Sequence, residues 1–118
     1  MKKIITLLFI ALVSTSITFA QNNSTKKADK LFDRLEYVKA AEEYLKLADK
    51  SPDNYIIERL ADSYYNIFNT REAEKWYSKI IDDEPDAEVI FRYSEMLKAN
   101  GKYKDCLLYT SPSPRDAT

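Results

Sequence analysis

Apolar and small residues recur at spacings of three and four from about residue 24 onward, which is the period of amphipathic helices. The pattern predicts five helices, at 24–35, 38–49, 54–67, 71–82 and 87–99, and a sixth that begins near Tyr103. Pro52 and Pro85 follow the second and fourth helices, and proline cannot continue the helical hydrogen-bond ladder. Asn69, with Glu72 three residues later, predicts a capping box for a helix starting near Thr70. We therefore expect an all-α chain.

The same pattern returns after 33 residues. This shift brings Ala28 onto Ala61 and then Ser94, and Tyr44 onto Tyr77. The other matching sets are Leu31, Tyr64 and Leu97; Ala40 and Ala73; Leu47 and Ile80; Pro52 and Pro85; Ile57 and Ile90; Leu60 and Tyr93. An internal period in this range is typical of stacked repeats. Each unit therefore predicts two helices that approach closely at the small residues, with the large residues filling the space between.

The second unit carries small-x-x-aromatic, then Ala-x-x-x-aromatic, then proline, as Ala61, Tyr64, Ala73, Tyr77 and Pro85. This pattern resembles the tetratricopeptide repeat (TPR), and the resemblance covers residues 22–105. It implies a helix-turn-helix solenoid of about two and a half repeats, truncated in the third. The units would span about 21–53, 54–86 and 87–105.

Two departures from the family pattern change the expected turns. The family's glycine between the two helices is present only as Gly101, and Leu35 and Phe68 take its place in the first two units. The period is 33 where the family usually has 34, and the missing residue falls after each proline. We therefore expect a tighter turn between one unit and the next.

The first twenty residues have the three parts of a secretory signal peptide. Lys2 and Lys3 form a basic start, residues 4–13 are apolar, and residues 14–20 are more polar and end in small residues suited to cleavage before Gln21. An uncleaved membrane anchor is the alternative, but a spanning helix needs about 20 mainly apolar residues and Ser14 interrupts the run. We expect an exported protein of the periplasm or the outer-membrane periphery.

The last residues differ in composition from the rest. Residues 106–116 match one reading frame of a transposon-end sequencing adapter codon for codon, and they bring in Pro112 and Pro114 after a charged, helix-forming segment. We interpret residues 106–118 as a non-native, adapter-derived tail; a native disordered tail is the alternative. We then expect helix 87–99 to lack a cover on one side, so that it frays or self-associates.

Charge and residue content exclude several functions. Residues 21–105 hold 15 basic and 18 acidic residues, a net charge of −3, which argues against nucleic-acid binding. The chain has no histidine and one glycine, Gly101, so the commonest general base and a glycine-rich phosphate loop are both absent. Glu42 with Glu43, and the acidic run at 82–86, lack the spacing of a calcium loop. We predict no enzymatic activity, no metal and no cofactor.

The resemblance implies that the first helix of each unit lines a concave peptide groove. Carried onto this chain, the groove residues are Asp29, Phe32, Asp33, Tyr55, Glu58, Asp62, Tyr65, Asn66, Phe91 and Glu95. Acidic side chains repel an acidic peptide tail, so a basic or neutral segment with apolar anchors fits better. The alternative is that these acids only keep the surface soluble.

Two hypotheses of function follow. The first is a non-catalytic protein–protein interaction scaffold of the cell envelope, with a protein or peptide partner. In the second, the repeats form the N-terminal module of a longer protein. Signal peptide plus repeat is similar to outer-membrane-associated proteins of Bacteroidota-type bacteria that end in a peptidoglycan-binding domain of the OmpA family. That resemblance implies peptidoglycan anchoring or secretion, with peptidoglycan contact made only through missing C-terminal domains.

Overall fold

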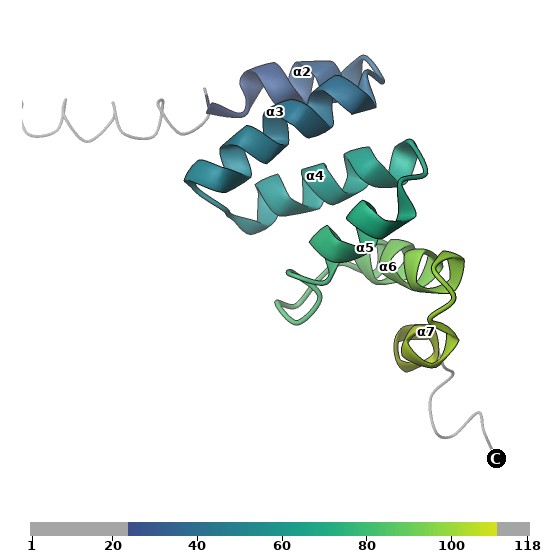
Figure 1. The fold of residues 1–118 in the computed structure, drawn as a ribbon. Helices are drawn as coiled ribbons and strands as arrows, with labels where there is room; N and C mark the ends of the chain where they lie inside the picture. The colour runs from purple at the N-terminus through teal and green to yellow at the C-terminus, as the bar shows by residue number, and fades with distance from the viewer. Residues whose placement is uncertain (1–23, 111–118) are drawn as a thin grey trace, which may run out of the picture.

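The computed structural model describes residues 24–110, and every regular element among them is an α-helix (Figure 1). The predicted signal peptide and residues 111–118 lie outside the described residues. The helices are α2 (Lys26–Asp33), α3 (Tyr37–Lys50), α4 (Asn54–Asn66), α5 (Thr70–Tyr77), α6 (Ala87–Ala99) and α7 (Tyr103–Thr110). The predicted all-α class is confirmed, and the sixth helix begins at Tyr103 as predicted.

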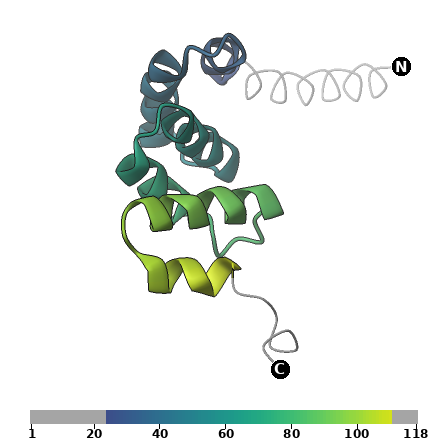
Figure 2. The same ribbon diagram turned by 90° about the vertical axis from the view of Figure 1, so that its right-hand side faces the viewer.

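Each helix packs mainly on its neighbours in the chain, from α2 on α3 through to α6 on α7. Besides these neighbours, α4 also touches α6, so first helices of successive units meet directly. Figure 2 shows the consequence: the helix pairs follow one another along one direction, from the α2–α3 pair to the α6–α7 pair. The chain is a helical-repeat solenoid of three helix pairs within the described residues.

The small residues of the repeat are buried in the core between the helices. Ala28, Ala61 and Ser94 are at most 2% exposed, and Ala40 and Ala73 are fully buried. Tyr44 and Tyr77, the large residues between them, are also fully buried. Burial of apolar side chains is worth roughly 1.5–3 kcal/mol for each large residue. The repeat positions read from the sequence are therefore the positions that hold neighbouring helices together.

Three turns between paired helices repeat the same backbone conformation. Leu35, Phe68 and Gly101 all have positive φ, at 63°, 57° and 79°. Each donates its N–H to the carbonyl three residues back, and the next residue donates to the carbonyl five residues back, as Glu36 does to Leu31 at 2.9 Å. This is the Schellman motif, which satisfies the last carbonyls of a helix. Leu35 and Phe68 therefore occupy a conformation that favours glycine.

Helix α5 is shorter than the sequence predicted. The prediction extended it to residue 82, but it ends at Tyr77, well before Pro85. The hydroxyl of Ser78 donates to the carbonyl of Lys75, which a continuing helix would offer to the N–H of Lys79. Lys79 donates instead to Trp76, three residues back, and the chain continues in tighter turns. Pro85 therefore does not end this helix, and the prediction was wrong there.

The predicted capping box is present only in part. Asn69 caps α5, which begins at Thr70 as predicted, because its side chain accepts from the N–H of Glu72 at 3.4 Å. The reciprocal bond to the N–H of Asn69 does not form, since that group donates to the carbonyl of Tyr64 in the Schellman turn. Asp53 caps α4 in the same way, accepting from Ile56 at 2.8 Å.

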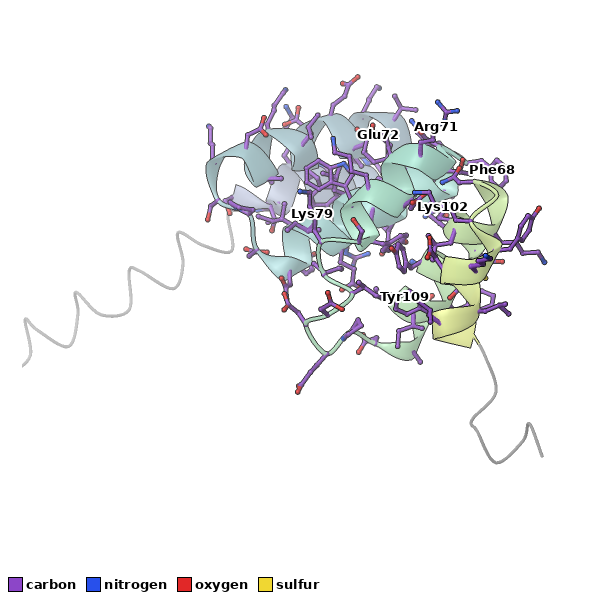
Figure 3. All side chains as sticks on the ribbon, turned by 60° about the horizontal axis from the view of Figure 1, so that its bottom comes forward. Phe68, Arg71, Glu72, Lys79, Lys102 and Tyr109 are labelled. Carbon is purple, nitrogen blue, oxygen red and sulfur yellow. The ribbon has the colours of Figure 1, made fainter. Side chains whose placement is uncertain are left out.

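Helix α7 covers the side of α6 that the sequence predicted to be open. Tyr109 lies on α7 (Figure 3). Its ring is 5.1 Å from the ring of Tyr93 on α6, in an edge-to-face arrangement. Tyr93 and Leu97 are 8% and 1% exposed. The expectation of an uncovered helix 87–99 is therefore wrong for this structure, because residues 103–110 are helical and pack on it.

Candidate functional site

The first helices of the three units, α2, α4 and α6, carry all ten predicted groove residues. Their burial separates them into three groups. Asp62 is buried; Asp29, Phe32, Glu58, Tyr65 and Glu95 are half-buried; Asp33, Tyr55, Asn66 and Phe91 are exposed. The predicted groove residues therefore share one set of helices but differ in how far they are exposed to a ligand.

Asp29 is held by hydrogen bonds from two other helices. The hydroxyls of Tyr44 on α3 and Tyr55 on α4 both donate to its Oδ1, the second at 2.8 Å. Arg59 on α4 lies over the ring of Phe32, 4.6 Å from the ring centre. Such cation–π contacts stabilise by roughly 0.5–1 kcal/mol at exposed sites. This cluster ties the first unit to the second, and we call it clamp 1.

Clamp 2 repeats this arrangement 33 residues further along the chain. Asp62 accepts from the hydroxyl of Tyr77 and forms an ion pair with Arg92, whose Nη1 lies 2.7 Å from Oδ1. Arg92 lies over the ring of Tyr65 at 5.2 Å and also pairs with Glu88. Asp62 is only 5% exposed, so its charge is directed inward at these partners. Asp62 therefore joins the second unit to the third and presents little charge to solvent.

The clamps keep their tyrosines protonated. Burial is the largest cause, and the neighbouring carboxylate adds to it, so the pKa values of Tyr44 and Tyr77 rise well above their usual value of 10. A protonated hydroxyl is the donor that each aspartate needs. Arg59 and Arg92 were missed as site residues by the sequence analysis. Their separation of 33 residues was the available signal.

Glu58 stands apart from the clamps. Burial, followed by the charges of Asp62 and Asp86, raises its pKa above the usual 4.5. Within residues 24–110 no hydrogen bond or ion pair is formed by its carboxylate. Glu95, by contrast, accepts from the hydroxyl of Tyr65 at 2.5 Å, and this bond raises the pKa of Tyr65.

A cavity of about 1070 Å³ lies where α4, α6 and α7 meet. Four of the predicted groove residues line it, namely Tyr65, Asn66, Phe91 and Glu95. The other lining residues are Phe68, Ser94, Met96, Lys98, Ala99, Tyr103, Cys106 and Leu107. Asp29 and Tyr55 line a smaller cavity of about 740 Å³ beside Asp53. The structure therefore divides six of the ten predicted groove residues between two cavities, and Phe32, Asp33, Glu58 and Asp62 line neither of them.

Phe68 is one of the lining residues that the groove prediction missed. It stands out from the turn after α4 (Figure 3) and is 74% exposed. The family pattern places groove residues only on first helices, so a residue of the turn gave no signal. From this turn, where its φ is 57°, Phe68 contributes to the lining of the cavity.

In the described part of the chain, no three or more Cys, Asp or Glu side chains are grouped so as to hold a metal ion. No helix there is both long enough and apolar enough to cross a bilayer. Comparison of the chain with models of protein families, with curated proteins and with solved structures gave no match. The site must therefore be interpreted from its own geometry.

Proposed function

We propose that the protein is a non-catalytic interaction scaffold of the cell envelope, built from tetratricopeptide repeats, whose first helices receive a protein or peptide partner. The observation that carries this proposal is the cavity between α4, α6 and α7, which has aromatic walls and coincides with four residues of the expected groove. Concave, mainly apolar cavities with a few placed polar groups are typical binding sites.

The polar clamps support the same function. Asp29 and Asp62 use their charges within the solenoid, which fixes the angle between successive units. A rigid set of first helices loses little conformational entropy when a partner binds, and this lowers the cost of association. The composition supports the proposal too, because the chain has no histidine for catalysis and a net charge that disfavours nucleic acid.

Site-specific photo-crosslinking in the source cell tests the binding role. Benzoylphenylalanine placed at position 91, in the cavity wall, should capture a discrete protein partner. The same residue placed at position 42, exposed on the second helix α3, is the matched control and should not. Equal capture at both positions, or none at position 91, would contradict the proposal. Export is tested separately: the N-terminus of the envelope-associated protein should begin at Gln21.

A second candidate is the N-terminal repeat module of a longer OmpA-family protein, acting in peptidoglycan anchoring or secretion. Its support is the exposure of Tyr103 on α7, at 64%, since stacked helices usually cover such residues with a further helix. Reading the source gene past the codon of Asp105 distinguishes the two. A long downstream frame favours the module, and a stop codon after one or two further repeats favours the free scaffold.

A further inference from the structure

The cavity between α4, α6 and α7 has one carboxylate set in an aromatic wall. Glu95 lies one turn after Phe91 on α6, so the two side chains are on the same face of the helix, about 6 Å apart along its axis. The hydroxyl of Tyr65 donates to Oε2 of Glu95 and fixes the position of the carboxylate. No ion pair in residues 24–110 involves Glu95, although Lys98 also lines the cavity.

The two charged side chains of the cavity wall are held differently. Glu95 is half-buried and fixed by Tyr65, whereas Lys98 is exposed and forms no ion pair in residues 24–110. Arg59 and Arg92, the arginines of the first helices, lie over aromatic rings, and Arg92 is also paired with Asp62. The rings of Tyr65, Phe68 and Phe91 in the cavity wall offer further faces that attract a cation. A cationic side chain therefore finds a fixed carboxylate beside aromatic rings, whereas an acidic one finds only the exposed Lys98.

Resting on the function proposed above, we infer that the partner is a peptide segment in which an apolar side chain and a lysine or arginine lie about 6 Å apart on one side. The apolar side chain fills the cavity against Phe91, Tyr65 and Phe68, and the cation pairs with Glu95. In an extended segment, residues two positions apart meet this spacing, because they project to the same side about 7 Å apart.

Four protein residues contact the partner in this assignment, and all of them precede Cys106. Tyr65 lies on α4, and Phe91 and Glu95 lie on α6, while Phe68 lies in the turn after α4. Phe91 is 57% exposed, so replacing it with alanine removes little buried packing. Glu95→Gln removes the charge while its amide oxygen can still accept the hydroxyl of Tyr65. Both variants are therefore expected to keep the fold, and circular dichroism checks this.

Three fluorescein-labelled peptides in a glycine–serine background test the inference with the full 118-residue chain. Each carries one phenylalanine, and the residue two positions later is arginine, glutamine or glutamate. We expect fluorescence anisotropy to show the arginine peptide binding tightest and the glutamate peptide weakest, with roughly fivefold between successive peptides. Glu95→Gln should abolish the difference between arginine and glutamine, and Phe91→Ala should weaken all three. Glu42→Gln on α3 is the matched control and should change nothing.

The outcomes separate this inference from the proposed function. Equal or tighter binding of the glutamate peptide, or no effect of Glu95→Gln, overturns the cationic partner. If Phe91→Ala then still weakens binding, the groove function stands. If none of the three peptides binds, the inference fails, and crosslinking at position 91 decides whether the proposed function fails with it.

Discussion

At the scale of single residues, the two clamps offer the same tyrosine–aspartate pair in two environments. Tyr77 donates to Asp62, which is 5% exposed, whereas Tyr44 donates to Asp29, which is half-buried. Without the tyrosine hydroxyl, the carboxylate of Asp62 keeps only Arg92 within residues 24–110, and that of Asp29 keeps only Tyr55. Loss of one donor to a buried carboxylate costs roughly 1–3 kcal/mol, but water can replace a donor at an accessible one. We expect Tyr77→Phe to lower the free energy of unfolding by about 1–3 kcal/mol and Tyr44→Phe by less, measured by urea denaturation. Equal losses would show that burial of the aspartate does not matter.

The same tyrosines predict an alkaline limit to stability. Because the pKa of each hydroxyl is raised in the folded state, its contribution is fully present below the unfolded pKa of 10 and is lost as pH rises above it. We expect the unfolding free energy to fall steeply between pH 10 and 11.5. In the Tyr44→Phe, Tyr77→Phe double variant this fall should be shallower. If the double variant loses as much stability above pH 10 as the parent protein, the hydroxyls of Tyr44 and Tyr77 are not the cause of the fall.

Removal of the negative charge of Glu58 is expected to stabilise the fold. Its pKa is raised by burial and by Asp62 and Asp86, so its contribution is most favourable below the unfolded pKa and is lost as pH rises through the folded value. Glu58→Gln should therefore raise the melting temperature at pH 7, and this gain should shrink toward pH 4. Glu42→Gln, at an exposed position on α3, is the control and should give no such pH-dependent gain.

At the scale of elements, the Schellman turns provide a series of equivalent positions. Leu35 and Phe68 have positive φ and are 70% and 74% exposed, so glycine there relieves backbone strain and removes little packing. Relief of roughly 1–2 kcal/mol, less the chain entropy that glycine loses, predicts a net gain of about 0.5–1 kcal/mol for each substitution. Gly101→Ala should cost a similar amount through its φ of 79°, since no atom obstructs the added Cβ.

A glycine in the middle of a helix tests whether the positive φ is the reason for the expected gain in stability at Leu35 and Phe68. Lys46→Gly, at an exposed position inside α3, should destabilise by about 1 kcal/mol in chemical denaturation. If glycine lowers stability at Leu35 and Phe68 as it does at Lys46, their side chains are more important to the turns than their φ angles indicate.

At the scale of the whole molecule, the solenoid predicts graded protection along the chain. Helices α3 to α6 each pack on a helix before and a helix after them, whereas α7 packs on α6 within the described residues. Leu107 and Leu108 are exposed on it. Because a stacked unit depends on its neighbours, amide exchange in a dilute monomer should be slowest in α4 and fastest in α7. Protection of α7 equal to that of α4 would contradict this order.

Several features followed from the sequence alone because they depend on local periodicity. The spacing of three and four gave the six helices, and the 33-residue shift gave the buried set Ala28, Ala61 and Ser94. Asn69 was read as a cap from its position before Thr70, and the structure agrees. Side-chain size and local hydrogen bonding are sufficient for such features, because each depends on residues one or two turns apart.

The tertiary structure alone decided which charges remain available to a ligand. The sequence predicted both Asp62 and Glu95 as groove residues. In the structure, Asp62 is buried against Tyr77 and Arg92, while Glu95 lines a cavity. The place of Phe68 in the lining of the cavity also depended on contacts in three dimensions. The early end of α5, by contrast, is accompanied by a local bond, from the hydroxyl of Ser78 to the carbonyl of Lys75, that the periodic pattern did not reveal. The periodic pattern fixes which helix carries a side chain. Whether its charge is neutralised depends on partners 15 to 30 residues away, and only the packing of successive units brings them together.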